Sequence, residues 1–546
     1  MVSVRILVTA FLPFKKNHSF SIRSKMFFFA PILLFFAMFW GPTSARANDI
    51  YIAQNAAGVA NGSSCANALP VSFFNSSSNW GIGTSQIGPG TAVHLCGTVG
   101  TTLVFAGNGA SGSPVTLFFE IGAKISTAAS DAIHLNGHSW IVIDGNGPRG
   151  TNGILENTAN GSGLSNHLST KAIEGSGASN IEVKNLLIQN FYVHASASDS
   201  AVDATLDTCY YANGTKGPVS FHDNQVHDVG WCLEFQGYGT NNTINVFNNY
   251  LYNYDHGITI AVNNTTDSAA VNIYNNHFGT TSNWDTTVNA YHHDGIHIYN
   301  NASAWAPGWS FNVYNNLFDG NWGINNTAHI FTEEHPPSLT LYNNVFLQAA
   351  GNMLNNGFVN ACGNNCSLYN NTFLGSGVTL SQCINLQVGS NQIFRNNVVT
   401  GCNTFVGTQS GATFAAGGLS NNIYAAVGPG GNPPFKYEDN TENNFGNWQS
   451  ATGQDGSPSL QVSSANLGTT GIPQSSSAVN GAGADLCSTT SLCASYSALA
   501  WDTSAGNSRT PQGRPTSGAW TVGAYNYPVS SGSLPAAPTG LVATVN

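Results

Sequence analysis

The stretch NAYHHDGIHIYNN, residues 289–301, holds the densest group of reactive side chains in the sequence: His292, His293, Asp294 and His297. Imidazole titrates near neutral pH, and a carboxylate can serve as acid or base. Such groups can therefore exchange protons with a bound molecule when they lie together. Further acids and imidazoles occur near similar short apolar segments: His227, Asp228, Glu234, Asp255, His256, Glu333, Glu334 and His335. Their chemistry depends on whether the fold brings these segments together.

An asparagine-marked repeat is the element that must position them. The segments FHDN, VFNN, IYNN, VYNN, LYNN, LYNN, FRNN and LSNN end at residues 224, 249, 276, 316, 344, 371, 397 and 422, and EVKN ends at residue 185. Most intervals are 25 to 28 residues, and the interval of 40 contains the histidine-rich stretch. Short alternating segments punctuated by Gly and Asn exclude long helices and predict strands.

A unit of about 26 residues with three strands is the size of one coil of a parallel β-helix. We therefore predict an all-β solenoid of about ten coils, in which the paired asparagines stack into a hydrogen-bonded ladder. An antiparallel sandwich is the alternative, but its hairpin turns would recur at half the observed period.

The first 47 residues have the order of a secretory signal peptide. Basic residues precede the apolar run 26–40, and the small residues of ARA end at Ala47, so we expect cleavage before Asn48. An uncleaved anchor helix is the alternative, but the run is shorter than the roughly 20 residues that span a bilayer. We assign 48–125 to an N-terminal capping segment, 126–527 to the solenoid and the Pro/Ser/Ala-rich 528–546 to a tail.

The charge of the expected mature chain excludes some partners. Six of the 15 Lys and Arg residues lie in the leader and none of the 26 acids does, which leaves nine cations and a formal charge of −17. Such a surface repels nucleic acids, anionic lipids and polyanionic glycans. We expect a secreted monomer with no nucleic-acid partner and no membrane association after cleavage.

Ten cysteines in an exported chain are expected to pair. Proximity suggests Cys65 with Cys96, Cys209 with Cys232, Cys362 with Cys366, and Cys487 with Cys493, which leaves Cys383 and Cys402. A cysteine metal site is disfavoured because no CxxC motif occurs.

Over roughly Ile50 to Tyr527 the chain resembles the right-handed parallel β-helix, or pectin-lyase-like, superfamily. The opening IYIAQNAAGVANGSSCANA resembles the first segment of secreted bacterial members, and the closing RTPQGRPTSGAWTVGAYNY resembles their final coil. Thr521 and Asn526 stand where that ending usually has acids. The resemblance implies a right-handed, single-stranded helix and little about chemistry. Pectate lyases of the superfamily generally use a Lys or Arg base, but residues 217–371 contain neither, and the polygalacturonase-type set NTD, DD, GHG and RIK is absent.

Alternation along the third strand of each coil gives a map of the site. Leu233, Ile258 and Ile296 should face the core, whereas Glu234, Thr259 and His297 should form one outward row. Just before these strands we expect His227–Asp228, Asp255–His256 and His293–Asp294 to stack at one corner, with Glu333 and Glu334 following in the next coil. Outward aromatic residues are expected to complete this face, although some, such as Trp231, are expected to pack at the corner: Trp231, Tyr254, Trp284, Tyr291, Trp305, Trp309 and Trp322.

Carboxylates one coil apart are about 5 Å apart, and two coils apart about 10 Å, which brackets the separations used in glycosidases. We predict Asp255 and Asp294 as catalytic carboxylates, because pairing would raise the pKa of one and leave the other ionised. His293, His297 and Glu234 are predicted to assist catalysis. The predicted substrate-binding residues are Tyr254, His256, Trp284, Tyr291, His292, Glu333 and Glu334.

No metal ligand is assigned and no cofactor is expected, since His293 and His297 would lie about 13 Å apart along a strand. A cross-coil site of His256, His293 and Asp294, and calcium bound by carboxylates and Asn carbonyls, stay open alternatives. So does a structural role, in which these side chains only cap turns.

The sequence thus predicts a secreted β-helix that binds and cleaves a neutral or weakly charged polysaccharide, as a hydrolase rather than a lyase. The alternative is a noncatalytic adhesive or structural protein.

Overall fold

The computed structural model describes residues 49–129, 131–160, 170–191, 208–281, 293–323, 326–348, 357–375, 382–428, 433–487, 497–501, 509–515 and 517–527. All of them belong to one compact unit, Ala45–Asn546. The predicted leader and tail lie outside the described residues. None of the described helices is long and apolar enough to cross a membrane.

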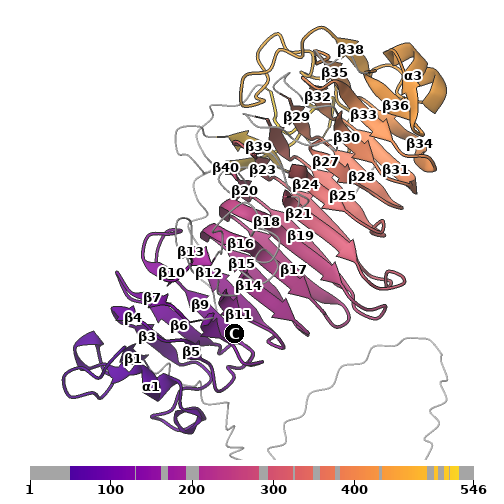
Figure 1. The fold of residues 1–546 in the computed structure, drawn as a ribbon. Coiled ribbons are helices and arrows are strands. Elements are labelled where there is room, and N and C mark those ends of the chain that lie inside the picture. The colour runs from indigo at the N-terminus through magenta and orange to yellow at the C-terminus, as the bar shows by residue number, and fades with distance from the viewer. Residues whose placement is uncertain are drawn as a thin grey trace, which may run out of the picture. The chain divides into compact units, whose positions relative to one another are not determined.

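Two stacked parallel sheets form the body of the protein, as Figure 1 shows from indigo β1 to orange β38. The 14-stranded sheet runs in the order β2 (Leu69–Pro70), β1 (Asp49–Ala53), β3 (Ala92–Leu95), β6 (Val115–Phe119), β9 (Ile141–Asp144), β12 (Ile181–Lys184), β15 (Val219–His222), β17 (Asn242–Phe247), β19 (Ala269–Tyr274), β22 (Ser310–Tyr314), β25 (Leu339–Tyr342), β28 (Cys366–Tyr369), β31 (Gly389–Arg395) and β34 (Ala412–Ser420). Its neighbours are joined by chain that passes through the other sheet, which confirms the predicted parallel β-helix.

The 24-stranded sheet supplies the remaining sides of each rung and carries the candidate site. Its strands are β4 (Thr98–Val99), β5 (Leu103–Val104), β7 (Lys124–Thr127), β8 (Asp131–His134), β10 (Gly153–Asn157), β11 (Lys171–Glu174), β13 (Leu186–Phe191), β14 (Thr208–Asn213), β16 (Gln225–Gln236), β18 (Tyr250–Val262), β20 (His277–Phe278), β21 (His293–Asn300), β23 (Leu317–Phe318), β24 (Asn326–Thr332), β26 (Val345–Leu347), β27 (Val359–Ala361), β29 (Thr372–Leu374), β30 (Gln382–Leu386), β32 (Val398–Thr400), β33 (Thr404–Thr408), β35 (Ile423–Ala425), β36 (Phe435–Tyr437), β37 (Asn440–Glu442) and β38 (Leu460–Val462). Pairing is parallel except between β36 and β37.

The number of rungs agrees with the prediction. Between residues 126 and 527 the 14-stranded sheet has ten strands, β9 to β34, as expected for about ten coils. In the segment expected to cap the solenoid, β1 pairs in register with β3, β3 with β6 and β6 with β9, so parallel stacking is already present there. Two short helices, α1 (Val71–Phe74) and α3 (Phe445–Thr452), lie near the two ends of the stack.

The core is a continuous column of apolar side chains. Inward residues alternate with outward ones on each strand, and the inward positions are buried. Phe278, Phe318, Phe346 and Phe373 stack in successive rungs, with ring centroids 4.5 to 4.8 Å apart. Stacking of equivalent positions keeps successive rungs in register.

The predicted asparagine ladder is confirmed. The side-chain amide of each second asparagine donates to the side-chain oxygen of the next, at 3.0 to 3.4 Å. The ladder residues are Asn224, Asn249, Asn276, Asn316, Asn344, Asn371, Asn397 and Asn422. All are buried, so each amide satisfies polar groups that water cannot reach.

The first residue of each pair has a different role. Asn248, Asn275 and Asn315 have φ values of 57°, 56° and 54°, in the left-handed region that Asn tolerates better than most residues. Asn185 takes this same position, because its neighbour Leu186 donates its backbone N–H to Asn224. Asn185 therefore aligns with the first asparagine of each later pair, and not with the second asparagine as the sequence repeat suggested.

The C-terminal segment lies on the outside of the stack rather than forming a final coil. The last described parallel strand is β38, and residues beyond it pack over outward apolar side chains such as Leu317 and Val345. Arg514 anchors this return by donating to the side-chain oxygen of Asn343 at 2.7 Å and to the Gly523 carbonyl at 2.8 Å. Strands β39 (Ser497–Trp501) and β40 (Arg509–Gly513) form a separate antiparallel pair.

The disulfides confirm part of the predicted pairing. Cys65–Cys96 and Cys362–Cys366 are bonded, and the two unassigned cysteines form Cys383–Cys402. Cys487 is disulfide-bonded, while its predicted partner Cys493 lies outside the described residues. The predicted bond between Cys209 and Cys232 is wrong: both thiols are free and buried on adjacent strands, where burial raises their pKa values.

Candidate functional site

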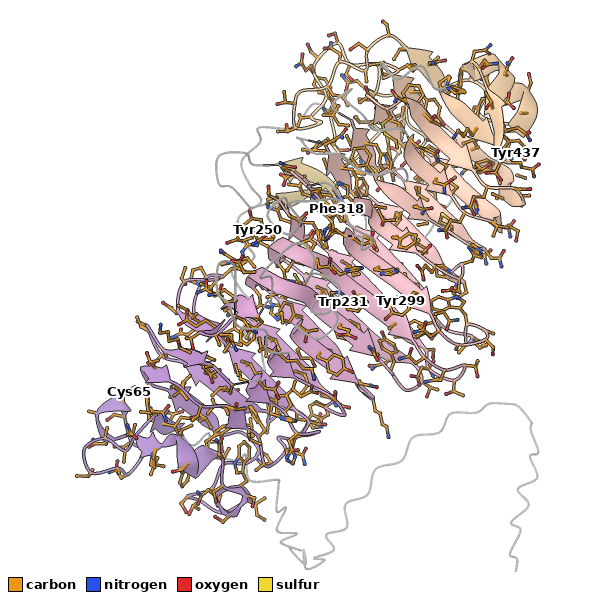
Figure 2. All side chains as sticks on the ribbon, in the orientation of Figure 1. Cys65, Trp231, Tyr250, Tyr299, Phe318 and Tyr437 are labelled. Atoms are coloured by element: carbon orange, nitrogen blue, oxygen red, sulfur yellow. A yellow bond between two sulfur atoms is a disulfide. The ribbon has the colours of Figure 1, made fainter. Side chains whose placement is uncertain are left out.

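Two rows of outward-facing side chains run across the strands of the 24-stranded sheet. The outer row consists of Tyr211 on β14, Glu234 on β16, Thr259 on β18 and His297 on β21, each opposite the next. The corner row consists of Trp231, His256 and Asp294, again in direct register. The predicted register of Glu234, Thr259 and His297 is therefore confirmed, but all three side chains are buried. Figure 2 shows Trp231 and Tyr299 over this part of the sheet.

His256 joins the two acids predicted to be catalytic. Its Nδ1 lies 2.6 Å from Asp255 Oδ2, and its Nε2 lies 3.4 Å from Asp294 Oδ2. Burial lowers the pKa of His256, but the two carboxylates outweigh burial and raise it to about 10. The imidazole therefore carries a positive charge between the acids at neutral pH.

Asp255 is held by donors on three strands. Besides His256, its Oδ2 accepts the indole N–H of Trp231 at 3.1 Å, and its Oδ1 lies 2.8 Å from His293 Nδ1. Burial raises the pKa of this carboxyl, but His256 and His293 lower it to about 2. Asp255 is thus the ionised acid, with only 3% of its surface exposed.

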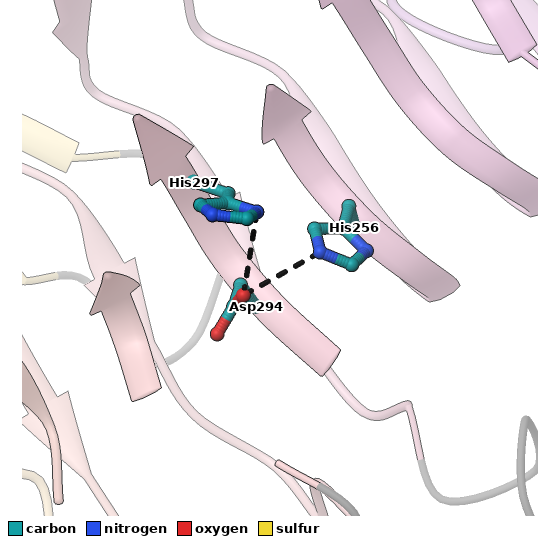
Figure 3. Close-up of side chains that lie close together, drawn as sticks. All are labelled: His256, Asp294 and His297. Carbon is teal, nitrogen blue, oxygen red and sulfur yellow. Dashed lines mark ion pairs between the residues drawn. The ribbon is translucent and has the colours of Figure 1, made fainter. Parts of the chain in front are cut away.

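Asp294 sits between His256 and His297, as Figure 3 shows. Its Oδ1 accepts the backbone N–H of Ala328 at 3.2 Å, while its Oδ2 lies 3.7 Å from His297 Nδ1. The carboxylate is fully buried, at 0% exposure. The acid oxygen and the two imidazole nitrogens all lie within 4.8 Å of one another.

Glu234 differs from Asp255, because its carboxyl is still about half protonated at neutral pH. Burial raises its pKa to about 7, although the amide of Gln236 donates to its Oε1. Its Oε2 has no hydrogen-bond partner among the described residues, and the side chain is 2% exposed. Glu234 in turn contributes, after burial, to raising the pKa of half-buried Tyr299 to about 12.

Glu333 and Glu334 lie at the rim of the cluster. Glu333 Oε1 is 3.8 Å from His297 Nε2, and the Glu333 side chain is 42% exposed, so the outer row reaches solvent here. Glu334 turns instead toward the backbone, where it accepts the N–H of Asn300 at 3.1 Å.

A glycine directly follows both His256 and Asp294 in the corner row, and the reason is steric. A Cβ at Gly257 would lie 2.4 Å from the carbonyl oxygen of Gly295, and a Cβ at Gly295 would lie 2.6 Å from that of His329. Neither approach is tolerable, so the close spacing of rungs behind His256 and Asp294 requires glycine at both positions.

Several predicted positions need correction. His227 pairs with Tyr252, so His227 and Asp228 do not stack with Asp255 and His256; Trp231 occupies that place. Tyr254 belongs to the hydrophobic core, where it packs against Trp322, so it is not part of the outer row. Of the predicted exposed aromatic residues, Trp231, Trp309 and Trp322 are also buried, whereas Trp305 is partly exposed.

Three predicted binding residues, Trp284, Tyr291 and His292, lie outside the described residues. Sequence reasoning also missed partners of the site. Trp231, expected to pack at the corner, lies opposite His256, as the repeat interval of 25 residues requires, but its contact with Asp255 was not predicted. Tyr211 lies opposite Glu234, and Tyr299 lies in the neighbouring row with Ala261 and Gln236; both follow from the same register.

Comparison with known proteins gives a match in structure but none in sequence. No family model matches the chain, and no curated protein matches it. Among solved structures it is similar to a mannuronic acid specific polysaccharide family 6 lyase enzyme from human gut microbiota, with 12% identity, a TM-score of 0.32, and coverage of 65% of this chain and 79% of that chain. A similarity at this level does not bear on the chemistry of this site.

Proposed function

We propose that the protein is a secreted carbohydrate-active β-helix that binds a glycan across the outer row and cleaves it by proton transfer. The observation that carries this proposal is the contrast between Glu234, with a pKa of about 7, and the Asp255–His256–Asp294 network one rung away, in which the pKa of Asp255 is about 2. Carboxyl groups held in opposite protonation states are what acid- and base-assisted glycoside cleavage requires.

Each group has a distinct part in the proposal. Glu234 donates the proton to the leaving oxygen, because it is the carboxyl that retains a proton. Asp294 supplies the second carboxyl group of the pair; its Oδ1 accepts the Ala328 N–H and its Oδ2 faces His256 and His297. Asp255 positions His256, because Trp231, His256 and His293 already surround it.

A neutral or weakly charged glycan fits the charge of this face. Lys171 on β11 is a cation next to the outer row. Its Nζ already pairs with Glu174 Oε2 at 2.6 Å. An acidic polymer would meet a strongly negative chain, and Lys171 is already paired with Glu174. Disulfides between Cys65 and Cys96 and between Cys383 and Cys402 support export, because such bonds persist in oxidising compartments.

The test is the Glu234→Gln variant on a panel of neutral and weakly charged polysaccharides, read for reducing ends and for unsaturated products. We expect the wild type to release reducing ends and the variant to lose about 100-fold or more in rate, the usual contribution of a general acid. Glu442→Gln, on β37 at the far end of the stack, is the matched control and should keep the wild-type rate. A wild-type rate in Glu234→Gln would remove this residue from the mechanism.

The second candidate is a noncatalytic adhesive or structural protein. It is favoured by a regular outer surface on the 14-stranded sheet, where rings stack at 4.4 to 4.8 Å through His222, Phe247, Tyr274, Tyr314 and Tyr342. Glycan retention without any released product would favour this candidate.

A further inference from the structure

Three atoms of the site converge as metal ligands do. His256 Nε2 and His297 Nδ1 lie 3.4 and 3.7 Å from Asp294 Oδ2, and the whole group spans no more than 4.8 Å. Donors bound at about 2.1 Å to one ion are about 3 to 3.5 Å from each other. Small side-chain rotations therefore suffice to bring all three onto one ion.

The second polar atoms of His256 and Asp294 are already hydrogen-bonded, His256 Nδ1 to Asp255 and Asp294 Oδ1 to the Ala328 N–H. The second nitrogen of His297, Nε2, lies 3.8 Å from Glu333 Oε1. Outer partners of this kind fix the tautomer of a ligating imidazole and the orientation of a ligating carboxylate. Glycines at 257 and 295 hold the rungs close enough for the three side chains to meet.

We propose that His256, Asp294 and His297 form a binding site for one divalent first-row transition metal ion. Two imidazoles and one carboxylate suit iron, manganese, cobalt or zinc and leave coordination positions open. Calcium is a poor fit, because it takes six to eight oxygen ligands. The set differs from the cross-coil alternative drawn from the sequence, since His293 faces Asp255 and His297 takes its place.

The open positions of such an ion would face polar atoms of the outer row. Glu234 Oε2 and Thr259 Oγ1 are buried and have no hydrogen-bond partner among the described residues. Both belong to the row that includes His297. A water molecule or an alcohol bound to the metal would give these atoms a partner. The proposal rests on this geometry and goes beyond the proposed cleavage reaction.

The test uses the mature chain without a histidine tag, stripped with chelator and titrated with Co²⁺. We expect one Co²⁺ per chain with visible d–d absorption, displacement by Zn²⁺ and no displacement by Ca²⁺. His297→Ala should reduce the affinity at least 100-fold, and Asp255→Asn, which changes an outer partner, about 10-fold or more. His277→Ala is the matched control, because this imidazole pairs with Asp319 at 2.6 Å on β20, outside the cluster.

The outcomes separate cleanly. The proposal fails if the wild type binds no Co²⁺, or if His297→Ala binds it as tightly as the wild type. Circular dichroism establishes that each variant folds, and His256→Gln serves as the second ligand variant if His297→Ala does not. Metal binding without glycan release would overturn the proposed function alone, whereas glycan release by a wild type that binds no metal would overturn this inference alone.

Discussion

At the scale of single residues, the same interaction occurs twice in different surroundings. Asp255 pairs with His256 at 2.6 Å where both side chains are almost fully buried, and Asp319 pairs with His277 at 2.6 Å where the acid is 29% exposed. A buried charge that loses its partner cannot be solvated, whereas an exposed one can.

This difference predicts the effect of matched substitutions on stability. Asp255→Asn should lower the free energy of unfolding by about 3 kcal/mol, because it leaves the His256 cation with Asp294 as its remaining acid. Asp319→Asn should cost less than about 1 kcal/mol. Urea unfolding followed by circular dichroism measures both. Equal losses in the two variants would mean that the buried network is not charged as described.

At the scale of the elements, one cluster links neighbouring strands of the 14-stranded sheet. Glu182 on β12 accepts from His222 on β15 at 3.1 Å and from Lys184 at 2.7 Å, and Asp223 contacts the other nitrogen of His222. The hydrogen bond from His222 is the main reason that the pKa of Glu182 falls to about 2. Burial lowers the pKa of His222, but Asp223 and Glu182 outweigh it and raise the value.

The pH dependence follows from the signs of these shifts. The Glu182 contribution is complete above the usual glutamate pKa, near 4.5, and is lost as pH falls toward 2. The His222 contribution is complete below the usual histidine pKa, near 6.5, and is lost at higher pH. The melting temperature of Glu182→Gln should therefore lie furthest below that of the wild type between about pH 4.5 and 6.5. Because Glu182 is partly exposed, we expect the substitution to lower the free energy of unfolding by less than about 1 kcal/mol. A difference in melting temperature between variant and wild type that does not vary with pH would contradict this account.

The elements also show what the sequence could predict. The ladder, the alternation of Leu233 and Glu234, and the register of Thr259 with His297 follow from the repeat and the two-residue period of a strand. The alignment of His227 with Asp255 failed because it matched residue types instead of the 25-residue interval. Side-chain rotation decides that His297, and not His293, turns to Asp294, and no periodicity encodes that choice.

At the scale of the whole molecule, the ladder ties each rung to the next. Asn276 donates to the Val246 carbonyl at 2.9 Å and to Asn316 Oδ1 at 3.1 Å, and its own oxygen accepts the backbone and side-chain N–H groups of Asn249 at 3.0 Å. A substitution here leaves buried polar groups unpaired in three rungs.

We therefore expect Asn276→Ala to lower the free energy of unfolding by about 3 kcal/mol, since several hydrogen bonds are lost at once. Asn275→Gly changes the adjacent residue, whose φ of 56° suits glycine, and should be nearly neutral. Thermal unfolding compares the two. If Asn276→Ala unfolds at the same temperature as the wild type, the ladder does not contribute to holding the rungs together.

The ladder bonds are as short across the 40-residue interval between Asn276 and Asn316 as across the 25-residue interval between Asn224 and Asn249. The number of residues between two successive ladder asparagines therefore does not affect how the rung closes. Insertions and deletions can therefore change the side chains that one rung carries without changing the geometry of the neighbouring rungs. A scaffold of this kind allows recognition to diversify by segment length, without a new fold for each ligand.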